Sequence, residues 1–140
     1  NRGFGDVRDI HSYPGPAIPP LEDNRAAVLG EFGGLGLPVK GHLWQDKKNW
    51  GYRNLKDADA LIRDYEHLIQ RLHVMVGQGL AAAVYTQTTD VEGEVNGLMT
   101  YDRKVMKMDL KRLKAANVKL HQPAPILEEV VPTSQNVKVN

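Results

Sequence analysis

The sequence predicts an α/β protein built on a parallel β-sheet, and three observations support this fold class. Two short apolar runs without helical period, 26–29 and 81–85, each end among turn-forming or polar residues. Strands that are buried on both faces of a parallel sheet have this pattern. The amphipathic stretch 57–76 lies between the two runs, and parallel neighbours need such a crossover. The order of the elements suits either an open parallel sheet or the last part of a closed barrel.

The composition is that of one globular domain of ordinary size, because the 140 residues are 41% hydrophobic and 25% charged. The 18 basic and 17 acidic residues nearly cancel, so charge gives no reason to expect a nucleic-acid or membrane partner. No apolar run approaches the roughly 18 residues of a membrane helix. Cysteine is absent, which excludes disulfides and thiolate metal sites, and we predict no metal and no cofactor. The chain begins with Asn1 instead of Met, which indicates a piece of a longer protein.

The N-terminal part is expected to hold two strands joined by a short or irregular connection. Weak alternation predicts a strand over 7–11, which ends before a Pro-Gly-Pro loop. The segment 17–24 contains two adjacent prolines and cannot form a long helix. The second strand is predicted over 25–31, too close to the first for a full crossover helix.

Glu31 is the main candidate for a functional residue in this part of the chain. It lies where an apolar strand ends in glycines, among residues too small to crowd it. A carboxylate there costs free energy unless it is hydrogen-bonded, paired or used in chemistry. In α/β barrels, catalytic residues lie at the C-terminal ends of strands. The alternative is a turn acid that caps a following helix, and this stretch alone favours neither interpretation.

The stretch 33–54 is long for a loop, and two tryptophans stand in its polar sequence. Long loops inside compact domains are usually functional or disordered, and tryptophans favour function. The flat apolar faces of Trp44 and Trp50 suit sugar rings or partner surfaces, so both are predicted to bind substrate. The alternative is that both pack the loop onto the core.

The clearest element is a helix from its N-cap, Asp57, to about Val76, where two nearby glycines end it. His67 and His73 are expected on its exposed surface. Its apolar residues recur every three or four positions and predict one buried face: Leu61, Ile62, Tyr65, Leu68, Ile69, Leu72 and Val76.

A third buried strand is predicted within 79–90, with polar side chains gathered at its C-terminal end. Tyr85 and Gln87 are candidate binding residues there, and hydrogen bonding to a neighbouring loop is the alternative for Gln87. A last helix is expected over about 109–116, with Leu110 and Leu113 facing inward.

Five blocks of the sequence, taken in order, carry a resemblance to a known family: Asp9–Pro14 (DIHSYP), Leu29–Gly34 (LGEFGG), Ala83–Asp90 (AVYTQTTD), Asn96–Leu98 (NGL) and Tyr101–Lys104 (YDRK). They resemble strands six to eight of glycoside hydrolase family 2, which includes β-galactosidases, β-glucuronidases and β-mannosidases. The resemblance implies the C-terminal portion of a TIM (β/α)8 barrel, incomplete in this chain. That segment would cover 1–121, and 122–140 would be a tail or linker in which 126–131 reads as a stray strand or linker.

The resemblance also implies an activity, the retaining hydrolysis of β-glycosides with Glu31 as the nucleophile. This chemistry needs two carboxyl groups about 5–5.5 Å apart, one as nucleophile and one as acid/base. The family carries its acid/base in an Asn-Glu pair at the end of strand four, and this sequence contains no Asn-Glu pair. The chain is therefore expected to be a fragment that is inactive alone.

The same resemblance assigns binding roles beside the nucleophile. His11 and Tyr13 match the end of strand six, where the family has a Tyr close to the nucleophile. Tyr85 matches an aromatic position at the end of strand eight where relatives often carry Trp, which leaves the sugar preference open. No role carries over to Trp44 and Trp50, because their loop varies within the family.

A β-glycoside is thus the expected partner, with neither nucleic acid nor membrane involved. Two other function classes stay open: a non-catalytic carbohydrate-binding or interaction module, and an unrelated α/β protein. A piece of a barrel would leave strand edges exposed, which predicts self-association. The cellular location is left open, with a periplasmic or secreted parent slightly favoured.

Overall fold

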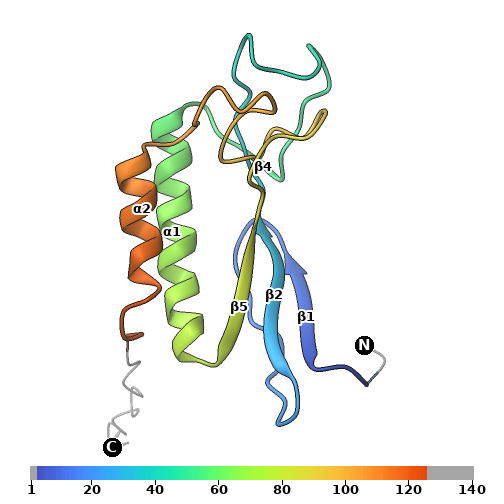
Figure 1. Cartoon of the computed structure of the whole chain (residues 1–140), viewed down its shortest axis with the longest axis vertical. Helices are drawn as coiled ribbons and strands as arrows, with labels where there is room; N and C mark the ends of the chain where they lie inside the picture. The colour runs from blue at the N-terminus through green and yellow to red at the C-terminus, as the bar shows by residue number, and fades with distance from the viewer. Residues whose placement is uncertain (1–2, 126–140) are drawn as a thin grey trace, which may run out of the picture.

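The computed structural model describes residues 3–125, which form two small parallel sheets and two helices (Figure 1). The sheet of β1, β2 and β5 has β2 in its centre, and β3 and β4 form the second sheet. The elements in chain order are β1 Val7–Ser12, β2 Ala26–Gly33, β3 Leu35–Gly36, β4 Arg53–Asn54, α1 Ala58–Gly77, β5 Leu80–Thr86 and α2 Leu110–Lys119.

The predicted buried strand is β2, and its apolar residues form the centre of the core. Leu29 and Phe32 of β2 are almost fully buried, and they belong to one cluster with the apolar stripe of α1. Both neighbours of β2 run parallel to it, with His11 opposite Glu31 on one side and Ala83 opposite Leu29 on the other. The C-terminal ends of the three strands therefore meet at one edge of the sheet.

The prediction that the chain is the C-terminal portion of a TIM barrel is wrong. Its three strands form an open sheet, and within residues 3–125 neither edge strand pairs with a further strand. The connection from β1 to β2 contains no helix, because prolines interrupt it. Helix α2 packs on α1, and Figure 1 shows both helices on the same side of the sheet. A barrel wall, in which a helix follows every strand and the sheet closes on itself, is therefore not formed: the sheet is open and the β1–β2 connection has no helix.

Helix α1 matches its prediction closely. Asp57 is the N-cap, and its Oδ1 accepts a hydrogen bond from the Ala60 N–H at 2.7 Å. Gly79 has a φ of +108°, which glycine adopts without steric cost, and there the chain turns into β5. The buried face holds six of the seven predicted residues: Leu61, Ile62, Tyr65, Leu68, Ile69 and Leu72.

Helix α2 is capped by Asp109 as predicted but extends further, to Lys119. Leu113 and Ala116 are buried against the core, whereas Leu110, predicted to face inward, is 58% exposed. The buried part of α2 thus begins at Leu113, one residue after Arg112. Neither helix of the described part is both long and apolar enough to cross a membrane.

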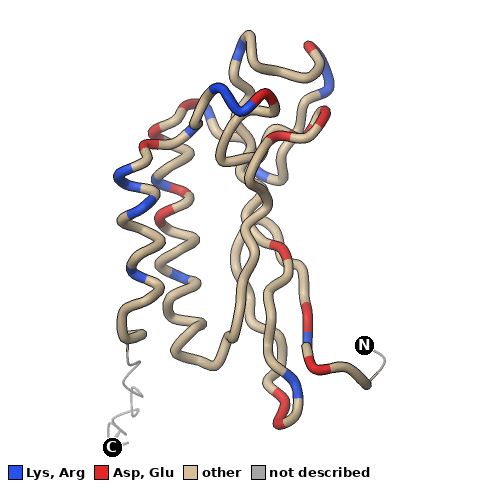
Figure 2. The backbone as a smooth tube through the Cα atoms, viewed as in Figure 1, with Lys and Arg blue, Asp and Glu red and all other residues tan. Residues whose placement is uncertain are grey.

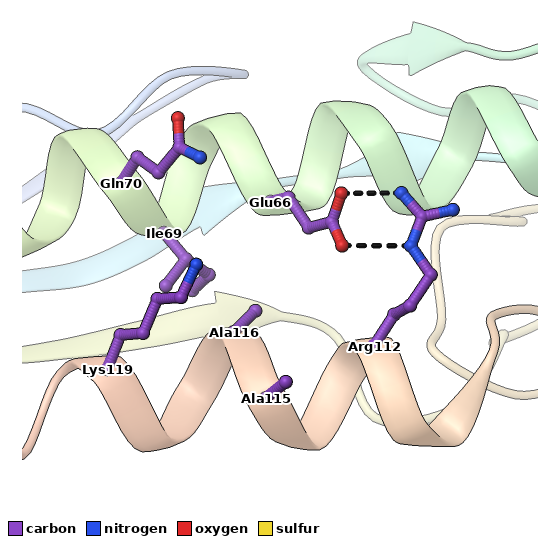
Figure 3. Close-up of a pocket in the computed structure, with 7 residues that line it drawn as sticks. All are labelled: Glu66, Ile69, Gln70, Arg112, Ala115, Ala116 and Lys119. Atoms are coloured by element: carbon purple, nitrogen blue, oxygen red, sulfur yellow. Dashed lines mark hydrogen bonds and ion pairs between the residues drawn. The ribbon is translucent and has the colours of Figure 1, made fainter.

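A groove of about 210 Å³ between the two helices is bridged by an ion pair (Figure 3). Arg112 donates from Nε to Glu66 Oε1 at 2.9 Å and from Nη2 to Oε2 at 2.5 Å. The Arg112 guanidinium lowers the pKa of the Glu66 carboxyl. Because both side chains are partly exposed, solvent screens the pair, and we assign the groove a structural role.

The stretch 33–54, predicted as one long loop, contains β3 and β4. Leu35 of β3 is buried in the core, which anchors the stretch. A Cβ on either Gly36 or Gly51 would lie within 3.0 Å of the other glycine's backbone, so this close approach requires glycine at both positions. The predicted stray strand or linker at 126–131 lies outside the described residues.

Candidate functional site

Glu31 lies near the C-terminal end of β2 with its side chain 42% exposed. The Tyr13 hydroxyl, from the loop after β1, donates a hydrogen bond to Glu31 Oε2. Thr86, the last residue of β5, places its Oγ1 2.9 Å from the same Tyr13 oxygen. Residues from all three strand ends therefore meet at this carboxylate.

The protons of this chain of contacts can be assigned. Tyr13 has one hydroxyl proton, which it donates to Glu31, so Thr86 is the donor to the Tyr13 oxygen. Burial and the hydrogen bond to Glu31 raise the pKa of Tyr13 above its usual value. Tyr13 therefore keeps its proton at neutral pH and stays a hydrogen-bond donor to the carboxylate.

The two glycines after Glu31 make room for aromatic rings. Both have a left-handed φ, +92° at Gly33 and +63° at Gly34, which disfavours other residues. A Cβ on Gly33 would come within 3.0 Å of the Tyr85 ring, and one on Gly34 would clash similarly with the Tyr52 ring. The glycines at 33 and 34 thus reflect close packing of aromatic rings next to Glu31.

A row of aromatic rings extends from Tyr13 across the surface. The Tyr52 ring stacks on the Tyr13 ring, with centroids 3.6 Å apart and planes 3° from parallel. Trp50 meets Tyr52 edge-on at 5.4 Å. Tyr52 and Trp50 are 48% and 45% exposed, so the row presents apolar faces beside the carboxylate.

His11 lies between two carboxylates of the sheet. Its Nδ1 is 3.4 Å from Glu31 Oε2, and its Nε2 is 3.4 Å from Asp9 Oδ2. Asp9 is fixed in turn, because its Oδ1 accepts a hydrogen bond from the Gly30 N–H at 2.8 Å. A Cβ on Gly30 would meet that carboxylate, so a larger residue here would push the Asp9 side chain aside. Asp9 belongs to β1 and Glu31 to β2, and Figure 2 shows acidic positions along these neighbouring strands.

The loop after β5 adds a chain of side-chain amides. Gln87, which follows Thr86, donates from Nε2 to Asn96 Oδ1 at 2.9 Å. Asn96 donates from Nδ2 to Glu94 Oε1 at 3.0 Å. The backbone of Trp50 also bonds to this loop, to Gly93 O and from Val95 N at 2.8 Å each. Backbone hydrogen bonds therefore join the aromatic row to the loop that carries the amide chain.

A buried ion pair between Lys107 and Asp90 fixes the backbone of the same loop. Lys107 Nζ donates to Asp90 Oδ1 at 2.5 Å and to the Val95 carbonyl oxygen at 2.9 Å. Asp90 Oδ1 also accepts from the Gly97 N–H at 2.8 Å. Burial raises the pKa of Asp90 and lowers the pKa of Lys107, as expected when both charges leave water.

Two of the predicted binding residues lie apart from this surface. Trp44 packs edge-on against Tyr101 at 5.5 Å, next to a hydrogen bond between His42 Nδ1 and Asp102 Oδ2 at 2.8 Å. Bonds from Thr100 and His42 lower the pKa of Asp102 to about 2. Tyr85 lies in the core, with its ring against Phe32 and Tyr65 and its hydroxyl buried.

From the predicted set, the structure thus brings Tyr13 and His11 into contact with Glu31. Trp50 joins them through Tyr52, and Gln87 follows Thr86 at the end of β5. The structure adds Tyr52, Thr86 and Asn96, which sequence reasoning did not select. Tyr52 belongs to the same long loop as Trp50, which weakly indicates that it could join the site. Nothing in the sequence indicates which ring Tyr52 stacks on.

Comparison with models of known protein families and with curated proteins finds nothing that matches this chain.

Proposed function

We propose that the chain supplies the nucleophile, Glu31, of a retaining β-glycosidase site. The observation that supports this most is the hydrogen bond from Tyr13 to Glu31 Oε2 at the C-terminal edge of the parallel sheet. A tyrosine that keeps its proton orients the carboxylate and leaves its other oxygen, Oε1, available for attack. The resemblance of the blocks around Asp9–Pro14 and Leu29–Gly34 to glycoside hydrolase family 2 assigns the same two residues.

The surroundings of Glu31 suit a sugar. Flat aromatic faces bind the apolar faces of sugar rings, and Tyr52 and Trp50 offer such faces beside the carboxylate. His11 and Gln87 provide polar groups that can bond to hydroxyls. An apolar platform with a few directed polar groups is the usual composition of a small-molecule site.

The proposed chemistry is half of a retaining mechanism. Glu31 attacks the anomeric carbon, the bond to the leaving oxygen breaks, and that oxygen departs with the electron pair. The side chains in contact with Glu31 among the described residues are Tyr13 and His11, neither of which is a carboxyl. We therefore propose that the acid/base is not supplied by this chain, which is inactive alone on ordinary glycosides.

The test uses a substrate whose leaving group needs no acid. The chain is incubated with 2,4-dinitrophenyl 2-deoxy-2-fluoro-β-glycosides, and labelled peptides are identified by mass spectrometry. The dinitrophenolate departs unprotonated, and the fluorine slows hydrolysis of the glycosyl ester. We expect one adduct on Glu31, no adduct in Glu31→Gln, and slower labelling in Tyr13→Phe.

Glu92→Gln is the matched control, because Glu92 is an exposed acid on the loop that carries Glu94. Labelling of this variant should equal wild type. Wild-type protein that stays unlabelled, or equal labelling in Glu31→Gln, contradicts the nucleophile role.

The second candidate is a non-catalytic carbohydrate-binding module, and the exposed aromatic row favours it. Such a module would show sugar-dependent quenching of Trp50 fluorescence, abolished in Trp50→Ala and retained in Trp44→Ala, without any adduct on Glu31. The labelling experiment separates the two candidates.

Self-association of the 140-residue chain is a further prediction. Parallel sheets are normally covered on both faces, yet Ala81, Ala82 and Val84 of β5 are exposed. The edges of β1 and β5 are also unpaired within residues 3–125. In sedimentation velocity we expect the average mass to rise above 15.6 kDa with concentration. A monomer at every concentration would contradict this prediction.

A further inference from the structure

We infer that Gln87 determines sugar specificity by presenting its side-chain carbonyl oxygen, Oε1, to a hydroxyl group of the substrate. Asn96 and Glu94 are positioning residues that fix this orientation. The inference rests on the proposed function of the Glu31 site and adds which hydrogen-bonding group the site offers.

The orientation follows from the chemistry of the last residue in the chain of amides. A carboxylate only accepts hydrogen bonds, so Asn96 must turn its NH2 group toward Glu94 Oε1, as it does at 3.0 Å. Asn96 Oδ1 is then the atom that faces Gln87, and it accepts from Gln87 Nε2 at 2.9 Å. With its NH2 group used, Gln87 has its carbonyl oxygen left to face outward.

Burial makes this order of donors and acceptors costly to reverse. Asn96 is fully buried, and its backbone carbonyl also accepts from the Gln87 N–H at 3.2 Å. A reversed amide would place two acceptors, Asn96 Oδ1 and Glu94 Oε1, against each other in a buried site, where an unpaired polar group is expensive. The chain of amides therefore has one stable direction.

Gln87 lies at the end of β5, one residue from a member of the Glu31 site. Gln87 directly follows Thr86, whose hydroxyl contacts the Tyr13 oxygen that binds Glu31. Gln87 is half-buried, and none of the residues 3–125 donates a hydrogen bond to its Oε1. An acceptor held this way selects a sugar with a hydroxyl that can donate at that point, and it disfavours a group that only accepts.

The orientation is tested first without a sugar. Asn96→Asp would place a second carboxylate against Glu94 and should lower the thermal midpoint. Adding Glu94→Gln supplies an NH2 donor to the new carboxylate and should restore most of the loss. A double variant no more stable than Asn96→Asp would overturn the assigned direction, and Asn96→Asp with Glu92→Gln is the matched control that should give no rescue.

The contact with the sugar is tested by labelling rates. The probe is the 2,4-dinitrophenyl 2-deoxy-2-fluoro-β-glycoside that labels Glu31 fastest, compared with derivatives whose C3, C4 or C6 hydroxyl is replaced by hydrogen or fluorine. At one position both replacements should slow labelling by about threefold to tenfold, because one hydrogen bond is lost. In Gln87→Ala the two replacements should no longer slow labelling, whereas in Glu92→Gln they should slow it as in wild type.

The outcomes separate this inference from the proposed function. If fluorine preserves the rate where hydrogen lowers it, Gln87 presents its NH2 group and the inference is wrong. If no position depends on Gln87, the inference is wrong although labelling of Glu31 stands. If wild-type Glu31 is never labelled, the proposed function fails and this inference fails with it.

Discussion

Replacing Lys107 with methionine is expected to destabilise the protein by about 3–5 kcal/mol. Lys107 and Asp90 have side chains that are 0% and 3% exposed, so the pair is shielded from water. Removing the ammonium leaves the Asp90 carboxylate buried with the Gly97 N–H as its remaining donor. Urea denaturation, followed by circular dichroism, measures the loss.

Two variants test whether the ion pair is the cause. Lys104→Met removes an exposed lysine from the same segment and should change the free energy of unfolding by less than about 0.5 kcal/mol. Lys107→Met combined with Asp90→Asn removes both charges, and Asn can still accept from Gly97. This double variant should therefore be more stable than Lys107→Met alone. Equal stability of the two would show that lost packing, not an unpaired charge, causes the effect.

The Lys107–Asp90 ion pair also affects the proposed site, because it holds a loop of that site in place. Lys107 bonds to Val95 and Asp90 bonds to Gly97, so both residues hold the loop that carries the amide chain. We expect Lys107→Met to weaken sugar discrimination by Gln87 at temperatures where the protein is still folded. Glu31 labelling itself should change less, because Tyr13 lies in the loop after β1, which the Lys107–Asp90 pair does not contact within residues 3–125.

Elements with a local signal were predictable from the sequence. Helix α1 has a continuous apolar stripe and an N-cap at Asp57, and the apolar run of β2 is bounded by turn-forming residues. Both signals depend on neighbouring residues alone. The prediction of a barrel is wrong because the sequence pattern of an apolar strand is the same in an open sheet and in a barrel.

Contacts between distant residues were predictable only in part. Glu31 is a candidate because it ends a predicted buried strand, and Tyr13 because of the resemblance to a family. The stacking of Tyr52 on Tyr13 and the bond from Thr86 depend on how three strand ends converge, which no local pattern encodes. Tyr85 is the opposite case. Its position at a strand end suggests a binding residue, whereas its ring points into the core.

Gly97→Ala is expected to destabilise the protein by about 3 kcal/mol through steric overlap. A Cβ at Gly97 would lie within 3.0 Å of three backbone groups: the nitrogen of Asp90, the carbonyl carbon of Thr89 and the oxygen of Met99. Backbone atoms cannot rotate away as a side chain can, so the two halves of the loop would have to separate. That movement would also stretch the 2.8 Å bond from the Gly97 N–H to Asp90 Oδ1.

Gly93→Ala is the matched control, because Gly93 lies in the same loop and its Cβ would come within 3.0 Å of the flexible end of Gln45 alone, with the Lys48 carbonyl oxygen at 3.1 Å. We expect it to cost less than about 1 kcal/mol in urea denaturation, since the Gln45 side chain can move aside. The Gly97 variant should in addition lose the dependence of labelling on Gln87, because Asn96 is its direct neighbour. If the two variants were equally stable, the tight packing of Gly97 against Asp90 would not be what holds this loop in place.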